Sequence, residues 1–133
     1  MRHLSSNILF VISAYKGNNA MADMTYHEEL KSVLQDRKDT FIEGEGRWEG
    51  KEEANFIVSS PAGVGHKIVK SVLLELADVF NQHSILEVDS TNSGLYLHTL
   101  DGKEEYLGKF RLSSEEPTGD YTKLNEMYIS LTN

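Results

Sequence analysis

A continuous apolar run near the start of the chain limits the possible folds more than any other feature. Residues 7–15 read NILFVISAY and include several β-branched side chains. A run of this kind, without polar alternation, is typical of a strand that is buried on both faces in the middle of a sheet. It is far shorter than the roughly 20 residues needed to cross a bilayer. The sequence therefore predicts a sheet built around this strand.

Two segments carry helical patterns. Residues 25–36 begin with capping-box spacing and continue with one apolar stripe, which predicts a first helix. Ser60 and Pro61 suit the N-cap and first position of a second helix, which is expected to end near Gln82. The residues expected on the buried face of that second helix are Ile68, Val72, Leu76, Val79 and Phe80.

The remaining patterns predict strands. Residues 54–59 alternate, so that Glu53 and Ile57 share the face opposite Phe56. The preceding segment holds Gly44 and Gly46, which fit a bulge or loop, or a close approach of backbone to a ligand. Further strands are expected at residues 85–88, 95–100 and 106–112, the last two joined by a tight turn at Asp101 and Gly102.

The order of these elements is β-α-β-β-α-β followed by a C-terminal hairpin. This order predicts one α+β domain over residues 1–133, with a ferredoxin-like antiparallel sheet and two helices on one face. The other face of that sheet is partly apolar. It has to be covered by the C-terminal tail or by another subunit, so we expect an oligomer.

Composition narrows the choice of ligand and compartment. The net charge of −8 argues against nucleic acid and is compatible with cationic small molecules or basic proteins, or simply with solubility. The absence of cysteine excludes thiolate chemistry and disulfides, and the histidines lack metal-ligand spacing. We expect a cytoplasmic protein without a membrane segment or a metal site.

The densest acidic cluster surrounds the predicted strand pair, and its members are Glu43, Glu45, Glu49, Glu52 and Glu53. A solvated hairpin end explains most of it. Glu53 differs because strand alternation places it on the face of Ile57, away from bulk solvent if that face is covered. A carboxylate held there needs a cationic partner, which a positively charged ligand can supply.

Several short motifs, collinear over about a hundred residues, resemble the bacteriophage S-adenosylmethionine lyases, formerly called hydrolases. The matching residues are VISAY at 11–15, Asn18, Met24, Thr25, His27, Leu30, Leu34, Glu53, Ala54, Ser59, Ser60, Gln82, Gly94, Leu95, Asp101, Gly102, Leu107 and Gly108. The resemblance implies a homotrimer similar to nitrogen-regulatory PII-like proteins, with sites between subunits. It also implies an anti-restriction role in the host cytoplasm.

The reaction implied by this resemblance converts S-adenosylmethionine to 5′-methylthioadenosine and L-homoserine lactone without metal or cofactor. The key glutamate of the family falls on Glu53. The aromatic residue associated with the position two before it is Lys51 here, which puts a role for an aromatic at that point in doubt unless Trp48 substitutes.

Each candidate residue has a hypothetical role. Glu53 holds the α-ammonium or the sulfonium region of the substrate, and Tyr15 and Tyr26 stack on adenine or face the sulfonium. The backbone of residues 13–15, which meets the turn containing Asn18, supplies hydrogen bonds to the adenine or to the carboxylate of the substrate. For His27 a structural role is favoured over a ligand contact. The candidate substrate-binding residues are thus Ser13, Ala14, Tyr15, Asn18, Tyr26 and His27.

Three other functions fit the same sequence. Glu53 could act as a general base in a hydrolase that releases homoserine. The chain could instead be a non-catalytic PII-like sensor that binds an adenine nucleotide between subunits. A decoy that binds basic host proteins is the third, although its acidic residues would be spread more widely than they are here.

Overall fold

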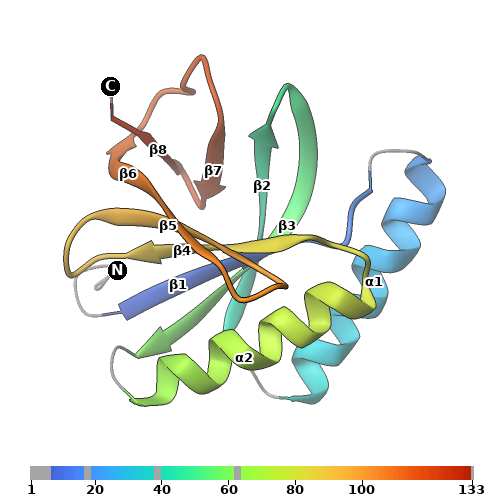
Figure 1. Cartoon of the computed structure of the whole chain (residues 1–133). Helices are drawn as coiled ribbons and strands as arrows, with labels where there is room; N and C mark the ends of the chain where they lie inside the picture. Colours follow the sequence, from blue (N-terminus) through green and yellow to red (C-terminus); the bar gives the residue numbers. More distant parts are fainter. Residues whose placement is uncertain (1–6, 17–18, 38–39, 62–63, 133) are drawn as a thin grey trace.

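The computed structural model describes residues 7–16, 19–37, 40–61 and 64–132. Within these ranges the first six elements follow the order β-α-β-β-α-β, and four more strands come after them (Figure 1). The elements are β1 (Asn7–Ile12), α1 (Ala20–Asp36), β2 (Phe41–Trp48), β3 (Lys51–Pro61), α2 (Val64–Val79), β4 (Ser84–Asp89), β5 (Gly94–Thr99), β6 (Glu104–Ser113), β7 (Tyr121–Leu124) and β8 (Met127–Leu131).

The strands form a closed antiparallel barrel in the order β1-β3-β2-β7-β8-β6-β5-β4. The expectation of an open ferredoxin-like sheet of the PII type is therefore wrong. The C-terminal hairpin closes the sheet into a barrel, because β7 pairs with β2 while β8 pairs with β6. That hairpin joins two sheet edges that would otherwise be free, and the second face of the sheet is covered within one chain. The reason for expecting a covering subunit disappears with it.

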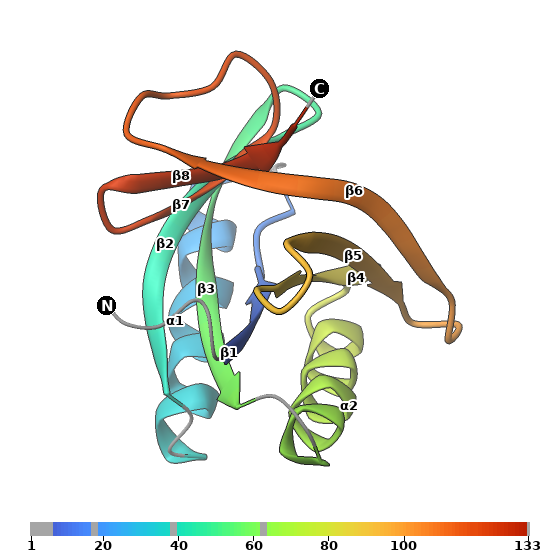
Figure 2. The same ribbon diagram turned by 90° about the vertical axis from the view of Figure 1, so that its left-hand side faces the viewer.

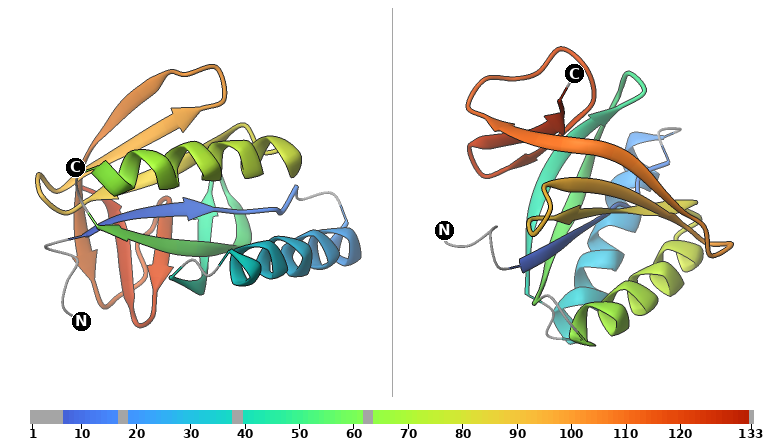
Figure 3. Two further views of the ribbon diagram at one scale, coloured as in Figure 1. Left: turned by 90° about the horizontal axis from the view of Figure 1, so that it is seen from below. Right: turned by 60° about the vertical axis from the view of Figure 1, so that its left-hand side comes forward.

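Two hydrophobic cores lie on opposite faces of the central strands. The first lies between the helices and the outer surface of the barrel, and it includes Phe10, Leu30, Phe56, Leu73 and Phe80. The second fills the barrel and draws on strands alone, with Leu9, Val11, Ile57, Val88 and Ile129 among its members. Because β1 contributes to both cores, the prediction of a strand buried on both faces is confirmed. Figures 2 and 3 show both helices outside the barrel, alongside β1 and β3.

Helix α1 begins one turn earlier than the sequence predicted. Asn19 is its N-cap, and the side-chain oxygen of Asn19 accepts a 3.1 Å hydrogen bond from the backbone N–H of Ala22. Thr25 lies inside the helix, where its hydroxyl donates to the carbonyl of Met21. The predicted end at Asp36 is confirmed.

Helix α2 also differs from its prediction. Pro61 is the last residue of β3, so Ser60 and Pro61 do not start the helix. The buried helix face carries Leu73 and Ala77, whereas Ile68 is 63% exposed and Val79 is 71% exposed. Of the residues predicted on the buried face, Leu76 and Phe80 do pack in the outer core. The alternation predicted for β3 is confirmed, since Phe56 belongs to the outer core and Ile57 to the inner one. Neither helix in the described part of the chain is both long and apolar enough to span a bilayer.

Candidate active site

Glu53 lies on β3 directly across from Gly46 of β2. Alternation places it on the inner face of the barrel together with Ile57. Its side chain is mostly buried, and burial raises the pKa of Glu53 to about 7. The strand thus holds a carboxyl group in surroundings that disfavour its charged form.

Asp23 adds to this effect. It lies in the first turn of α1, is 5% exposed, and accepts a 2.9 Å hydrogen bond from the backbone N–H of Lys16. The negative charge of Asp23 is the second cause that raises the pKa of Glu53, after burial. No side chain in the described ranges forms a hydrogen bond or ion pair with Glu53. Glu53 is therefore a mostly buried carboxyl group without a cationic partner among the described residues.

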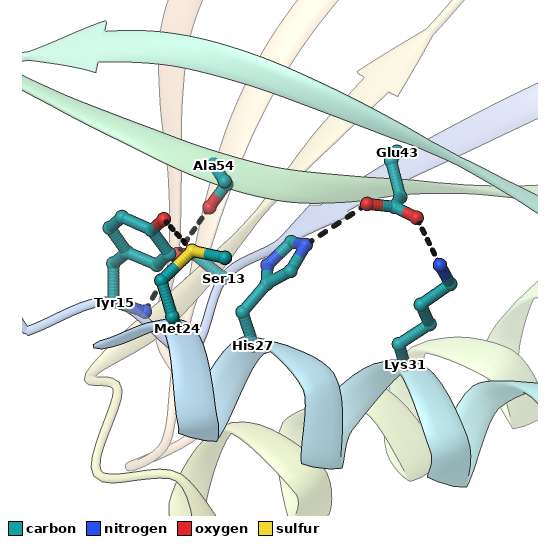
Figure 4. Close-up of polar contacts among 7 residues, drawn as sticks. All are labelled: Ser13, Tyr15, Met24, His27, Lys31, Glu43 and Ala54. Atoms are coloured by element: carbon teal, nitrogen blue, oxygen red, sulfur yellow. Dashed lines mark hydrogen bonds and ion pairs between the residues drawn. The ribbon is translucent and has the colours of Figure 1, made fainter. Parts of the chain in front are cut away.

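The segment after β1 is fixed beside Glu53 by the hydroxyl of Ser13. That hydroxyl donates to the carbonyl of Ala54 at 2.9 Å and accepts from the N–H of Tyr15 at 3.0 Å (Figure 4). Ala14 is fully buried in the outer core. Both side chains are used structurally, so what residues 13–15 offer a ligand is backbone and the side chain of Tyr15.

Tyr15 is partly exposed and held from several sides. Its hydroxyl contacts the sulfur of Met24 at 3.3 Å, and its carbonyl accepts a 2.8 Å hydrogen bond from the side chain of Gln82. Its ring meets the ring of His27 edge-on, with centroids 5.9 Å apart. The ring is thus oriented, with its hydroxyl beside the sulfur of Met24 (Figure 4), and it stays partly exposed.

His27 is 3% exposed and stacks on Phe56 with ring centroids 4.3 Å apart. Its Nε2 lies 3.2 Å from Glu43, which also pairs with Lys31 at 2.6 Å. Lys31 and then His27 lower the pKa of Glu43. Nδ1 of His27 has no hydrogen-bond partner in the described structure. Most of the His27 ring is therefore used to join α1 to the barrel wall.

Tyr26 differs from Tyr15 in that a cation already lies over its ring. The ammonium of Lys16 is 4.8 Å from the ring centroid, and the ring packs against the outer core. Asn18 falls outside the described residues. The structure thus joins Ser13 to Ala54, the residue after Glu53, and links Tyr15 to this point through the Ser13 hydroxyl, with the His27 ring in contact with the Tyr15 ring.

The two glycines of β2 do not form a bulge, because β2 and β3 pair in unbroken register. A Cβ on Gly44 would lie 2.9 Å from Oδ1 of Asn55, and one on Gly46 would lie 3.2 Å from its Nδ2. The glycines therefore make room for the Asn55 side chain. Sequence reasoning missed both Asn55 and Asp23. A polar residue that faces two cross-strand glycines was the signal for Asn55.

Within the described ranges, no group of three or more histidine and carboxylate side chains could hold a metal ion. A second buried carboxylate–imidazole pair, Glu87 and His98 at 2.6 Å, joins β4 to β5 away from Glu53. Nδ1 of His98 also lies 3.7 Å from the exposed Glu104, so this pair extends toward the surface on β6.

Fold and site define a small closed β-barrel protein with a mostly buried acid on its inner face. The model of the S-adenosylmethionine lyase family matches residues 10–131. Because this match covers nearly the whole sequence, the chain belongs to the S-adenosylmethionine lyase family. A comparison with curated proteins gave no match.

Proposed function

We propose that this chain cleaves S-adenosylmethionine to 5′-methylthioadenosine and L-homoserine lactone, in the site around Glu53. The family supplies the class of substrate and reaction. The observation that carries the proposal is the mostly buried Glu53, which lacks a cationic partner among the described residues and lies near a second carboxylate, Asp23. A buried carboxylate of this kind is stabilised by a ligand with positive charge.

S-adenosylmethionine carries two positive groups, the sulfonium and the α-ammonium, and one carboxylate. Binding its ammonium beside Glu53 restores the charged form of the carboxylate and compensates for its burial. The carboxylate of the substrate is then held away from the two protein carboxylates by repulsion. This orientation directs it toward its own γ-carbon.

The reaction requires no external nucleophile. One oxygen of the substrate carboxylate bonds to the γ-carbon while the carbon–sulfur bond breaks, and the electron pair stays on sulfur in a neutral thioether. Positive sulfonium and negative carboxylate disappear together, so a site with little water favours the step. Holding the methionyl arm curled can provide an effective molarity of ~10⁵ M, or about 7 kcal/mol of the barrier.

The remaining candidate residues support binding in this proposal. The exposed face of Tyr15 receives the sulfonium or the adenine, and a cation–π contact there contributes about 0.5 to 2 kcal/mol. The backbone of residues 13–15 and the side chain of Asn18 bind the adenosine part. Tyr26 and His27 line the outer side of this region. In a phage-infected host cytoplasm, the reaction depletes the methyl donor of restriction–modification systems.

Hydrolysis is the second candidate, and one observation favours it. A carboxyl group with a pKa of about 7 suits a general base that works near neutral pH, where it could activate water. The product would then be homoserine in place of its lactone. Everything else in the site would serve both reactions.

Product analysis in ¹⁸O-labelled water tests the proposal. Purified chain is incubated with S-adenosylmethionine, and products at early times are identified by mass spectrometry beside a no-protein control. The proposal predicts methylthioadenosine together with unlabelled lactone. Homoserine carrying ¹⁸O from the first time point would establish hydrolysis, and no product above the control would refute enzymatic cleavage.

A further inference from the structure

Asn55 lies in the middle of β3 with its side chain fully buried. Neither Oδ1 nor Nδ2 of its amide has a hydrogen-bond partner among the described residues. Buried amides are normally paired, because desolvation of an unpaired donor or acceptor costs free energy. An unpaired amide beside a candidate active site points to a partner that arrives with the ligand.

The amide lies next to Glu53 on the same face of β3. The two residues are two positions apart on one strand, or about 7 Å. Nδ2 of Asn55 lies toward Gly46, which is the cross-strand partner of Glu53, whereas Oδ1 lies toward Gly44. The donor end of the amide is therefore turned toward the carboxyl group of Glu53.

Trp48 closes this corner of the barrel. A Cβ on Gly46 would lie 3.3 Å from Nε1 of Trp48 as well as 3.2 Å from Nδ2 of Asn55. The Trp48 ring is partly buried against the inner core. The Trp48 indole thus lies on the Gly46 side of the fully buried amide.

A donor and an acceptor side by side suit the end of an α-amino acid. Such an end carries an ammonium and a carboxylate on one carbon, and a span of about 7 Å between two side chains lets each bind one group. Glu53 can accept from the ammonium, and Nδ2 of Asn55 can donate to one carboxylate oxygen. The other carboxylate oxygen stays free.

We infer that Asn55 binds the carboxylate of the substrate and fixes which of its oxygens faces the γ-carbon. This assignment rests on the proposed function, and it adds carboxylate recognition to the ammonium recognition by Glu53. It explains why the strand keeps a buried amide opposite two glycines. It also defines the ligand class as molecules with an intact α-amino acid end.

Decarboxylated S-adenosylmethionine isolates this contact, because it keeps the sulfonium and the ammonium but lacks the carboxylate. The experiment compares kcat/KM for S-adenosylmethionine with the inhibition constant of the decarboxylated compound. In Asn55→Leu we expect kcat/KM to fall about 10- to 100-fold, the loss typical of a hydrogen bond to a charged group. The inhibition constant should stay within about twofold. Asn55→Ala serves as a second variant if leucine does not fit.

Thr122→Val is the matched control. Thr122 is also fully buried, and its hydroxyl has no hydrogen-bond partner among the described residues. It lies on β7 as the cross-strand partner of Gly46, so strand β2 separates it from Glu53. In this variant, kcat/KM for S-adenosylmethionine and the inhibition constant of the decarboxylated compound should both stay unchanged. The urea midpoint of Asn55→Leu should equal or exceed that of the unchanged chain, because an unpaired amide is removed.

Three outcomes would overturn the assignment: unchanged kcat/KM in both Asn55 variants, an equal loss for the two compounds, or a lowered urea midpoint that accounts for the loss. A failure of the proposed function looks different, since the unchanged chain would then not cleave S-adenosylmethionine. Equilibrium binding of the two compounds would still test Asn55 in that case. Equal affinities for them in the unchanged chain would refute carboxylate recognition.

Discussion

The hydroxyl of Ser13 donates a 2.9 Å hydrogen bond to the carbonyl of Ala54, the residue that follows Glu53. The same hydroxyl accepts from the N–H of Tyr15. One small side chain therefore sets the distance between the segment after β1 and the start of β3. The hydroxyl thus links the backbone of Tyr15 to the residue after Glu53, and the relative position of Tyr15 and Glu53 depends on this link.

Ser13→Ala removes both hydrogen bonds. We expect the free energy of unfolding to fall by about 1–2 kcal/mol, since the partly buried carbonyl of Ala54 and the N–H of Tyr15 lose a partner. Turnover should fall several-fold as the site loosens. Urea unfolding and steady-state kinetics measure the two effects. Ser130→Ala is the matched control, because Ser130 is 5% exposed and its hydroxyl is unpaired within the described structure; an equal loss in both variants would contradict the account.

Glu53→Gln should stabilise the free protein in a pH-dependent way. The pKa of Glu53 is raised from 4.5 to about 7 by burial and by Asp23, so the folded chain binds this proton more tightly than the unfolded chain does. The stability that this proton contributes is fully present below pH 4.5 and is lost as the pH rises through 7. The free energy of unfolding of Glu53→Gln should exceed that of the unchanged chain by near zero at pH 4.5 and by roughly 2 kcal/mol at pH 8, a value reduced for the partial exposure of the carboxyl.

Urea unfolding at several pH values measures this gain. Glu52→Gln, at the exposed neighbouring position, is the control for the loss of one carboxylate from the same strand. A Glu53→Gln gain that does not change with pH would show that Glu53 is solvated and would remove the basis for its role.

Tyr15→Leu should weaken substrate binding several-fold, because it removes a cation–π contact of about 0.5 to 2 kcal/mol. Tyr15→Phe keeps the ring and loses only the contact with Met24, so it should remain close to the unchanged chain. Tyr26→Leu should affect binding less, since Lys16 already lies over that ring. The Michaelis constant for S-adenosylmethionine checks all three, and full affinity in Tyr15→Leu would exclude the contact.

Gly46→Ala should lower the free energy of unfolding by about 1–3 kcal/mol through overpacking. Its Cβ would lie 2.7 Å from the carbonyl oxygen of Tyr121, where β2 and β7 close the barrel. Gly119→Ala is the control, because a Cβ there meets nothing within 4 Å. Urea unfolding measures both, and a Gly46→Ala variant as stable as the control would show that the seam is looser than described.

The central elements could be predicted from sequence, because each has its own periodicity. Residues 7–15 and 54–59 show their burial through apolar runs and alternation, and the turn at Gly102, with φ +88°, shows itself through its glycine. Closure could not be predicted in the same way. It depends on β7, a strand of four residues, which pairs with β2 far along the chain. No local pattern specifies such a contact.

The site was predictable in part for a similar reason. Glu53 was found from its face on the strand and from the family resemblance. Asn55 shares that face but resembles an ordinary strand residue until its cross-strand partners are known to be glycines. Asp23 was missed because helix α1 was expected to begin at Thr25, which left Asp23 in a turn. Asn19 competed with Thr25 as a cap, and both are common cap residues.

The central claim is that the charge of Glu53 is balanced by a cationic substrate. It is tested most directly by titrating the ¹³C-labelled Glu53 carboxyl by NMR, with and without a non-cleavable analogue that carries a fixed positive charge and an ammonium. We predict a pKa of about 7 in the free protein, which falls by at least about one unit when the analogue binds. A pKa that stays the same on binding would contradict the account.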